Sequence, residues 1–265
     1  MSDNSELEHL PKQSRTAVTL SATRASLIAR ARKDAAGLRM EKSRLTLPTP
    51  AASADHLNVR EPTDADEQFK LGRKYFRGEG VEQDFSQAAL WLRKSADQGH
   101  AVAQQALGTL FEKGQGIEQD YAQAGYWYRK AAAQNDPLAQ YCLGLMYMWG
   151  HGVGMDHSQA AAWYRKAAEQ GNKNAQWQLG NLYSDGLGVA VDYSEAYFWW
   201  YLSFYRSVRP EQTRFVSAHE KAKARLTVKQ VAETQERAHV WLAAHPQNAT
   251  DDNRPLPSGI SGART

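Results

Sequence analysis

Apolar and glycine positions recur with a fixed period along the middle of this chain. Each repeat is 36 residues long, and four copies follow one another without a shift of even one residue. The shared landmarks are a Leu-Gly pair, an aromatic, a Gly-x-Gly, an aspartate and a tryptophan. The pairs are Leu71-Gly72, Leu107-Gly108, Leu143-Gly144 and Leu179-Gly180, and the tryptophans are Trp91, Trp127, Trp163 and Trp199. A fixed period of this length indicates a stacked repeat array.

The third copy illustrates the helices that each repeat is expected to form. Apolar side chains at helical spacing predict a first helix from Leu138 to about Trp149 and a second from about His157 to Glu169. Between them, Gly150 and Gly152 supply the backbone angles that end the first helix. A glycine inside a helix costs about 1 kcal/mol relative to alanine. We therefore expect Gly144 and its counterparts to lie where the second helix crosses close to the backbone.

An aspartate precedes each second helix, with glutamine or glutamate three residues later. Asp156 and Gln159 represent this pair in the third copy. The spacing is that of a capping box, in which the aspartate accepts free backbone amides and the third residue reaches back. Each repeat is thus expected to be a helical hairpin, which needs neighbours to bury both of its faces.

The order of these motifs resembles the Sel1-like repeat family, a sister of the tetratricopeptide repeat. It runs Leu-Gly-x-x-Tyr, Gly-x-Gly-Val, Asp-x-x-x-Ala, Trp-Tyr-Arg-Lys-Ala-Ala, Gln-Gly, and covers Ala65 to about Tyr205. The resemblance implies an all-α fold, a right-handed superhelical α-solenoid of four 36-residue helical hairpins within residues 63–208. The expected repeats are about 65–100, 101–136, 137–172 and 173–208. The last copy departs from the pattern at Trp200-Tyr201-Leu202, and we expect it to face a terminal cap.

Residues 209–245 are expected to form that cap. One helix should run from Pro210 to Leu226, since proline favours a helix start. Thr227 and Gln230 should open another helix with a capping box. The two helices would cover an apolar flank formed by Phe198, Trp200, Tyr201 and Phe204. The tail, residues 246–265, is expected to be disordered.

Residues 1–62 differ in composition from the array. They contain no aromatic residue and carry ten Lys and Arg against seven Asp and Glu, and we expect a disordered basic arm and linker. Within the arm, residues 12–44 hold nine basic residues against two acidic ones, and residues 22–40 could form a basic amphipathic helix. Two interpretations stay open. The arm is a disordered tail with transient helix, or it contacts an acidic surface, a membrane or the protein's own groove.

Charge and hydropathy argue against several partners and locations. Residues 63–265 carry 22 residues of each charge sign, so the array is a poor candidate for binding nucleic acid. The first ten residues are acidic rather than basic, which is unlike a secretory signal. No run of about 20 apolar residues is long enough for a transmembrane helix. We therefore expect a cytoplasmic protein.

The sequence offers no positive sign of catalysis, and we expect no cofactor and no metal. Cys142 is the one cysteine and has no counterpart in the other repeats, unlike Sel1-like proteins with a disulfide in each repeat. A small core residue is the simpler interpretation. His151 and His157 lie six apart across a glycine loop, which is not a zinc-binding spacing.

The positions where the four repeats disagree most mark a candidate binding face. If the hairpins are tetratricopeptide-like, the concave side carries the residues two before the Leu of each pair, and two, five and six after it. Those of the second repeat and the end of the fourth are Gln105, Thr109, Glu112, Lys113, Ser184 and Asp185. The candidate partner-binding residues are Phe69, Arg73, Phe76, Arg77, Tyr141, Leu145, Met148, Trp149, Trp177 and Asn181.

Four of these residues form one apolar stripe, which has two interpretations. The stripe is Tyr141, Leu145, Met148 and Trp149. It could be ordinary core. We favour a partner-binding patch, because other side chains already occupy the packing positions and the stripe would make the helix apolar all round. Large aromatics also dominate binding hot spots.

These observations favour a non-enzymatic adaptor or scaffold that binds a peptide or protein segment on the concave face, as the family resemblance also implies. Two alternatives remain. One is a hydrolase or small-molecule binder that uses a pocket between repeats, and the other is a tether that acts through the basic arm.

Overall fold

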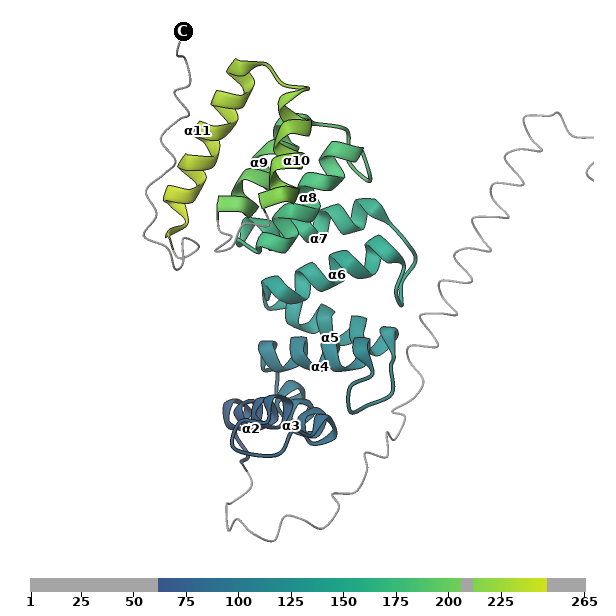
Figure 1. Cartoon of the computed structure of the whole chain (residues 1–265). Helices are drawn as coiled ribbons and strands as arrows, with labels where there is room; N and C mark the ends of the chain where they lie inside the picture. Colours follow the sequence, from purple (N-terminus) through teal and green to yellow (C-terminus); the bar gives the residue numbers. More distant parts are fainter. Residues whose placement is uncertain (1–61, 206–211, 247–265) are drawn as a thin grey trace, which may run out of the picture. The chain divides into compact units, whose positions relative to one another are not determined.

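The computed structural model describes residues 62–205 and 212–246, which contain ten helices and no strand (Figure 1). The predicted N-terminal arm, the start of the first capping helix at Pro210 and the tail beyond Pro246 lie outside the described residues. The helices are α2 (Ala65–Arg77), α3 (Phe85–Asp97), α4 (Ala101–Lys113), α5 (Tyr121–Ala133), α6 (Pro137–Trp149), α7 (His157–Glu169), α8 (Lys173–Asp185), α9 (Tyr193–Tyr205), α10 (Gln212–Lys223) and α11 (Val228–Ala244).

Helices α2 to α9 pair in sequence order into four hairpins, and each hairpin packs on the next (Figure 1). Each of these eight helices has 13 residues. The predicted bounds in the third repeat are confirmed, to within one residue for α6 and without difference for α7. The all-α solenoid of helical hairpins expected from the sequence is therefore the fold of the described residues.

The glycine in the middle of each first helix lies against a large side chain of its partner helix, as predicted. A Cβ atom added at Gly108 would come within 2.7 Å of the Tyr128 ring, and one at Gly144 within 2.4 Å of the Tyr164 ring. In the fourth repeat, a Cβ at Gly180 would lie 2.5 Å from Trp200. Only glycine leaves room for these side chains between the helices.

The second glycine of the Gly-x-Gly in the last three repeats has a role that the sequence did not reveal. A Cβ at Gly116 would lie 2.2 Å from the main-chain carbonyl of Phe85 in the preceding repeat, and Gly188 approaches His157 equally closely. At Gly80, in the first repeat, no described atom lies within 4 Å. These glycines therefore join neighbouring repeats as well as ending helices.

The predicted aspartate caps are present, but the predicted reciprocal contact is wrong. Asp156 Oδ1 accepts hydrogen bonds of 2.9 Å from the amides of Ser158 and Gln159. The amide of Asp156 donates instead to the carbonyl of Tyr147 at 2.9 Å. Because that amide is already satisfied, the Gln159 side chain has nothing to cap. The capping box expected at the start of α11 is confirmed.

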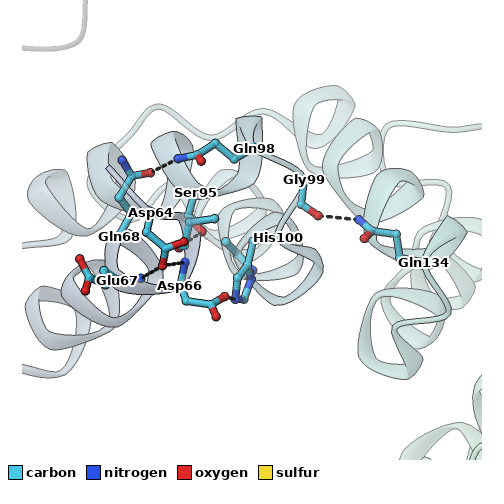
Figure 2. A network of polar contacts seen from close by, with 11 residues as sticks. Asp64, Asp66, Glu67, Gln68, Ser95, Gln98, Gly99, His100 and Gln134 are labelled. Carbon is cyan, nitrogen blue, oxygen red and sulfur yellow. Dashed lines mark hydrogen bonds and ion pairs between the residues drawn. The ribbon is translucent and has the colours of Figure 1, made fainter. Parts of the chain in front are cut away.

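Glutamine side chains connect the two helices of a hairpin and also join successive repeats. Gln98 Nε2 donates to Gln68 Oε1 at 2.8 Å within the first repeat, as Figure 2 shows. Gln134 Nε2 donates to Gln104 Oε1 at 2.8 Å and to the carbonyl of Gly99 in the preceding repeat at 2.9 Å. The third repeat has the equivalent pair, with 2.8 Å between the two side chains. Buried amides are costly unless paired, so these bonds fix the relative position of the helices.

The tryptophans that recur in the second and third repeats both pack against the core, Trp127 more fully than Trp163. Trp127 is 2% exposed. Trp163 is partly buried and packs against the same core cluster. The ammonium groups of Lys130 and Lys166 lie over the two rings, 5.0 and 4.2 Å from the ring centres.

Helices α10 and α11 pack on α9 and cover the last hairpin (Figure 1). Gln235 donates to the Tyr197 hydroxyl at 2.9 Å, and His239 lies 2.8 Å from the Tyr201 hydroxyl. One assignment was wrong, since Trp200 does not belong to this flank. It faces the first helix of its own hairpin, because Gly180 leaves the space for it there.

Candidate binding face of the first helices

The candidate residues come from α2, α4, α6 and α8, and we call the side formed by these positions the first-helix face. In the second and fourth repeats, the large side chain that lies over the central glycine reaches this face with its polar end. The Tyr128 hydroxyl lies 3.2 Å from Thr109 Oγ1 and donates to Glu112 at 2.6 Å. The Trp200 indole donates to Asn181 at 3.0 Å. In these two repeats, the first-helix face therefore includes one side chain from the second helix.

In the first repeat, the two aromatic candidates are used in packing. Phe69 stacks on His100, the N-cap residue of α4, with 4.6 Å between ring centres. Phe76 meets Phe85 edge-on at 5.4 Å. Arg73 and Arg77 are exposed, and Arg77 pairs with a nearby glutamate. Ion pairs this exposed contribute little to stability, so the arginines remain accessible to a partner.

In the second repeat, the first-helix face is polar, and its side chains form hydrogen bonds with one another within the hairpin. Gln105 donates to Thr109 Oγ1 at 3.0 Å, and the chain continues to Tyr128 and Glu112. Burial raises the pKa of Tyr128, as do the hydrogen bond to Glu112 and nearby charges, so the hydroxyl stays protonated and donates. Lys113 is exposed at the end of the helix. This repeat leaves no buried donor on the face for a partner to satisfy.

In the third repeat, the first-helix face is apolar and partly open. Tyr141, Leu145 and Met148 are half-buried against the core cluster of the last two repeats. The Tyr141 ring lies 5.8 Å from the Tyr164 ring. Trp149, at the end of α6, is 60% exposed. The stripe is thus partly buried at Tyr141, Leu145 and Met148 and mostly exposed at Trp149.

In the fourth repeat, hydrogen bonds hold the candidate residues in place. Trp177 is half-buried, with its ring 5.9 Å from that of Trp200. Asn181 accepts from the Trp200 indole through Oδ1 and donates to Gln178 through Nδ2 at 3.2 Å. At the helix end, Asp185 pairs with Lys221 of α10 at 2.9 Å. Asn181 therefore presents its amide in a fixed orientation beside an aromatic ring.

Sequence reasoning missed an apolar edge beside Trp149. Met155, in the loop after α6, is 67% exposed, and its counterpart Val191 is 54% exposed. A Cβ at Gly150 would lie 3.4 Å from Met155 Cβ, so this side chain adjoins the end of α6. The first two repeats have Gln83 and Gln119 at the same position. A comparison of this position between the four repeats would have revealed the change from polar to apolar residues.

Sequence reasoning also missed the polar group at the centre of the third repeat. The Tyr164 side chain is fully buried, and its hydroxyl has no hydrogen-bond partner among the described residues. The Tyr164 ring packs between the two helices of the hairpin, over Gly144. The sequence does carry a signal for this. The positions that hold Thr109 and Glu112 in the second repeat hold Leu145 and Met148 in the third, and neither of these side chains can accept a hydrogen bond from the hydroxyl.

The described residues offer little reactive chemistry near this face. Burial raises the pKa of Cys142 to about 12, and the charge of Glu112 adds to the effect. Since the thiolate is the reactive form, Cys142 is a poor nucleophile at neutral pH. Among the described residues, no group of three or more His, Cys, Asp or Glu could hold a metal ion. No described helix is long and apolar enough to cross a membrane.

Comparison with known proteins identifies the repeats. A sequence model described as Sel1 repeat matches residues 68–100, 101–136, 137–172 and 173–205. A Sel1 repeat protein from Oxalobacter formigenes has a similar crystal structure. The two chains are 29% identical, the match covers 72% of this chain and 73% of the other, and the TM-score is 0.52.

A second similar structure is a protective antigen present in uropathogenic Escherichia coli strains, which displays an SLR fold. It is 27% identical with a TM-score of 0.49, and the match covers 74% of this chain. This chain spans half the length of that antigen, since 50% of the other chain is covered. A search of curated proteins gives no significant match.

Proposed function

The chain belongs to the Sel1 repeat family, and on that premise we propose that it is a non-enzymatic adaptor. Members of this family commonly serve as scaffolds for protein–protein interaction. The proposed site is the first-helix face of the third and fourth repeats, and the proposed ligand is a peptide or protein segment. Tyr141, Leu145, Met148, Trp149, Trp177 and Asn181 are the residues proposed to contact it.

One observation carries this proposal, the 60% exposure of Trp149. The repeat pattern does not require an aromatic there, because the equivalent residues are Arg77, Lys113 and Asp185. An exposed tryptophan beside half-buried aromatic and aliphatic side chains has the composition of a binding hot spot. Met155 extends the apolar surface beyond the end of α6.

The first and second repeats support this choice of site. Side chains on their first-helix face are already used in internal contacts, as Phe69 is with the N-cap residue of α4 and Tyr128 is with Glu112. The arginines of the first repeat, Arg73 and Arg77, are proposed as a second contact region for the acidic part of a longer partner. Exposed charges of this kind affect association rate more than affinity.

The test is affinity purification with the full chain as bait, compared with the Trp149→Ala variant. Proteins that bind the proposed site should be captured by the wild type and lost from the variant. A hot-spot truncation costs about 2 kcal/mol or more, which corresponds to a roughly thirtyfold weaker complex. Because Trp149 is mostly exposed, the variant should unfold at the same temperature as the wild type.

Tyr126→Ala is the matched control. Tyr126 is an aromatic residue on a second helix and is 41% exposed, so its removal takes a similar amount of apolar surface from another part of the molecule. It should capture the same proteins as the wild type. Equal recovery of every protein by wild type and Trp149→Ala would overturn the proposed site.

A further inference from the structure

The hydroxyl of Tyr164 is one of six buried side-chain nitrogen or oxygen atoms that have no hydrogen-bond partner among the described residues, and it adjoins the proposed binding site. Nearly all buried polar groups in native proteins have a partner, yet none is present here among the described residues. The pKa of Tyr164 is raised by burial and by the neighbouring Tyr141 and Cys142, so the hydroxyl carries its proton at neutral pH. The Gln178 side chain opposes this rise but does not reach hydrogen-bond geometry. Tyr164 is therefore a donor without an acceptor.

The other repeats show what the acceptor would normally be. Tyr128 and Tyr164 lie over their glycines with the same ring edge, Cδ1 and Cε1. The Tyr128 hydroxyl finds Thr109 and Glu112 on the first-helix face. Leu145 and Met148 replace those two residues in the third repeat. By analogy with Tyr128, the polar end of Tyr164 points toward the same face, where no described residue lies within hydrogen-bond distance of it.

The surroundings of this hydroxyl belong to the proposed binding site. The Tyr141 ring lies 5.8 Å from the Tyr164 ring, and Leu145 and Met148 are half-buried on the same side. In the next repeat, Gln178 and Asn181 form an amide pair, with 3.2 Å between Nδ2 and Oε1. Leu145 and Met148 pack against the buried cluster that includes Tyr164. Because a methionine side chain is flexible, we propose that a displacement of Met148 gives a ligand access to the hydroxyl.

We propose that the Tyr164 hydroxyl donates a hydrogen bond to a main-chain carbonyl of an extended peptide bound over Tyr141 and Trp177. This rests on the function proposed above and specifies the ligand. A peptide in helical conformation has already used most of its carbonyls internally. An extended segment offers a free carbonyl at every residue. An isolated donor within an apolar surface therefore selects an extended chain with apolar side chains.

The experiment uses a peptide as the probe. A random library of 12-residue peptides is selected on the full-length protein and counter-selected on Trp149→Ala, and the tightest peptide is kept. Its affinity is then measured for the wild type and for Tyr164→Phe by titration calorimetry. Removal of this hydroxyl should weaken the complex about three- to tenfold, the range for a single net hydrogen bond. Stability in urea should not fall, because the free protein loses no internal bond.

Tyr128→Phe is the matched control, since it removes the same atom from the equivalent position in the second repeat. That hydroxyl is bound to Thr109 and Glu112, so this variant should be less stable than the wild type. Its affinity for the peptide should be unchanged. Tyr164→Phe is thus expected to weaken binding without lowering stability, and Tyr128→Phe to lower stability without weakening binding.

Three results would overturn the inference. If Tyr164→Phe binds the peptide as tightly as the wild type, the hydroxyl has no acceptor in the complex and the proposed function still stands. If Tyr164→Phe is destabilised as much as Tyr128→Phe, the hydroxyl has an internal partner such as Gln178. If no peptide depends on Trp149, the proposed function fails and the inference fails with it.

Discussion

A glycine in the middle of each first helix determines which side chain can lie between the two helices of a hairpin. At Gly144 the space is filled by the Tyr164 ring, and at Gly180 by Trp200. The helix loses stability by having glycine there, but the hairpin gains the burial of a large aromatic. The same placement brings the Trp200 indole to Asn181 on the first-helix face. A packing residue and a candidate binding residue are therefore positioned by one glycine.

We expect Gly144→Ala to destabilise the protein although alanine favours helix formation. The added Cβ would lie 2.4 Å from the Tyr164 ring, and overpacking of this kind costs about 1–3 kcal/mol. Denaturation in urea should show a lower free energy of unfolding. Gly154→Ala is the control, because no described atom lies within 4 Å of that Cβ, and it should change stability by no more than about 0.5 kcal/mol. A Gly144→Ala protein as stable as the wild type would contradict this packing.

At the scale of the helices and loops, the Gly-x-Gly loop connects one repeat to the one before it. Gly116 lies against the carbonyl of Phe85, and Ser86 Oγ donates to the Gly116 carbonyl at 3.2 Å. The loop therefore serves two purposes. Its first glycine ends a helix, and its second allows the backbones of two repeats to approach closely.

Comparison of two loop substitutions would measure this contact. Gly80 and Gly116 both have positive φ, 76° and 72°, so alanine at either position costs about 1–2 kcal/mol of backbone strain. Only Gly116→Ala also drives a Cβ into the preceding repeat. Thermal and urea denaturation should show that it is less stable than Gly80→Ala by about 2 kcal/mol. Equal losses would mean that the repeats are not held together at this loop.

The helices of the third repeat were predictable from the sequence to within a residue, although α10 ends at Lys223 rather than at the expected Leu226. The exposure of the candidate face was not predictable. Periodicity assigns Tyr141 and Trp149 to the same side of α6, because it depends only on spacing. It does not report that Tyr141 is half-buried and Trp149 mostly exposed, since that depends on how the neighbouring hairpin covers the helix. Trp200 was misplaced for the same reason. The central glycine, not the sequence neighbours, decides which way that ring points.

At the scale of the whole array, α11 covers the outer side of the last hairpin. Gln235 and His239 hydrogen-bond the hydroxyls of Tyr197 and Tyr201, and the Arg237 guanidinium lies 3.9 Å from the Phe198 ring centre. Repeat arrays need an end of this kind, because an uncovered hairpin exposes an apolar surface. In this chain the cover is partly aromatic and partly polar.

Truncation after Tyr205 should therefore produce a protein that dimerises or aggregates. The side chains of Tyr197, Phe198 and Tyr201 would become exposed on α9, and light scattering coupled to size exclusion would detect the association. A shorter truncation that removes only residues 247–265 is the control, because it leaves α11 in place. It should remain in the same state as the full chain. A monomeric product of the longer truncation, melting at an unchanged temperature, would show that α11 is not a cap.

The glutamine bonds have a consequence for how such a chain can change in length. Gln134 must meet Gln104 at a separation of 30 residues and Gly99 at a separation of 35. An insertion or deletion of a few residues inside a hairpin would shift one partner and leave a buried amide unpaired, at a cost of about 1–3 kcal/mol. Gain or loss of a complete repeat would preserve every such separation. The array is therefore expected to tolerate changes in length only in whole multiples of its period.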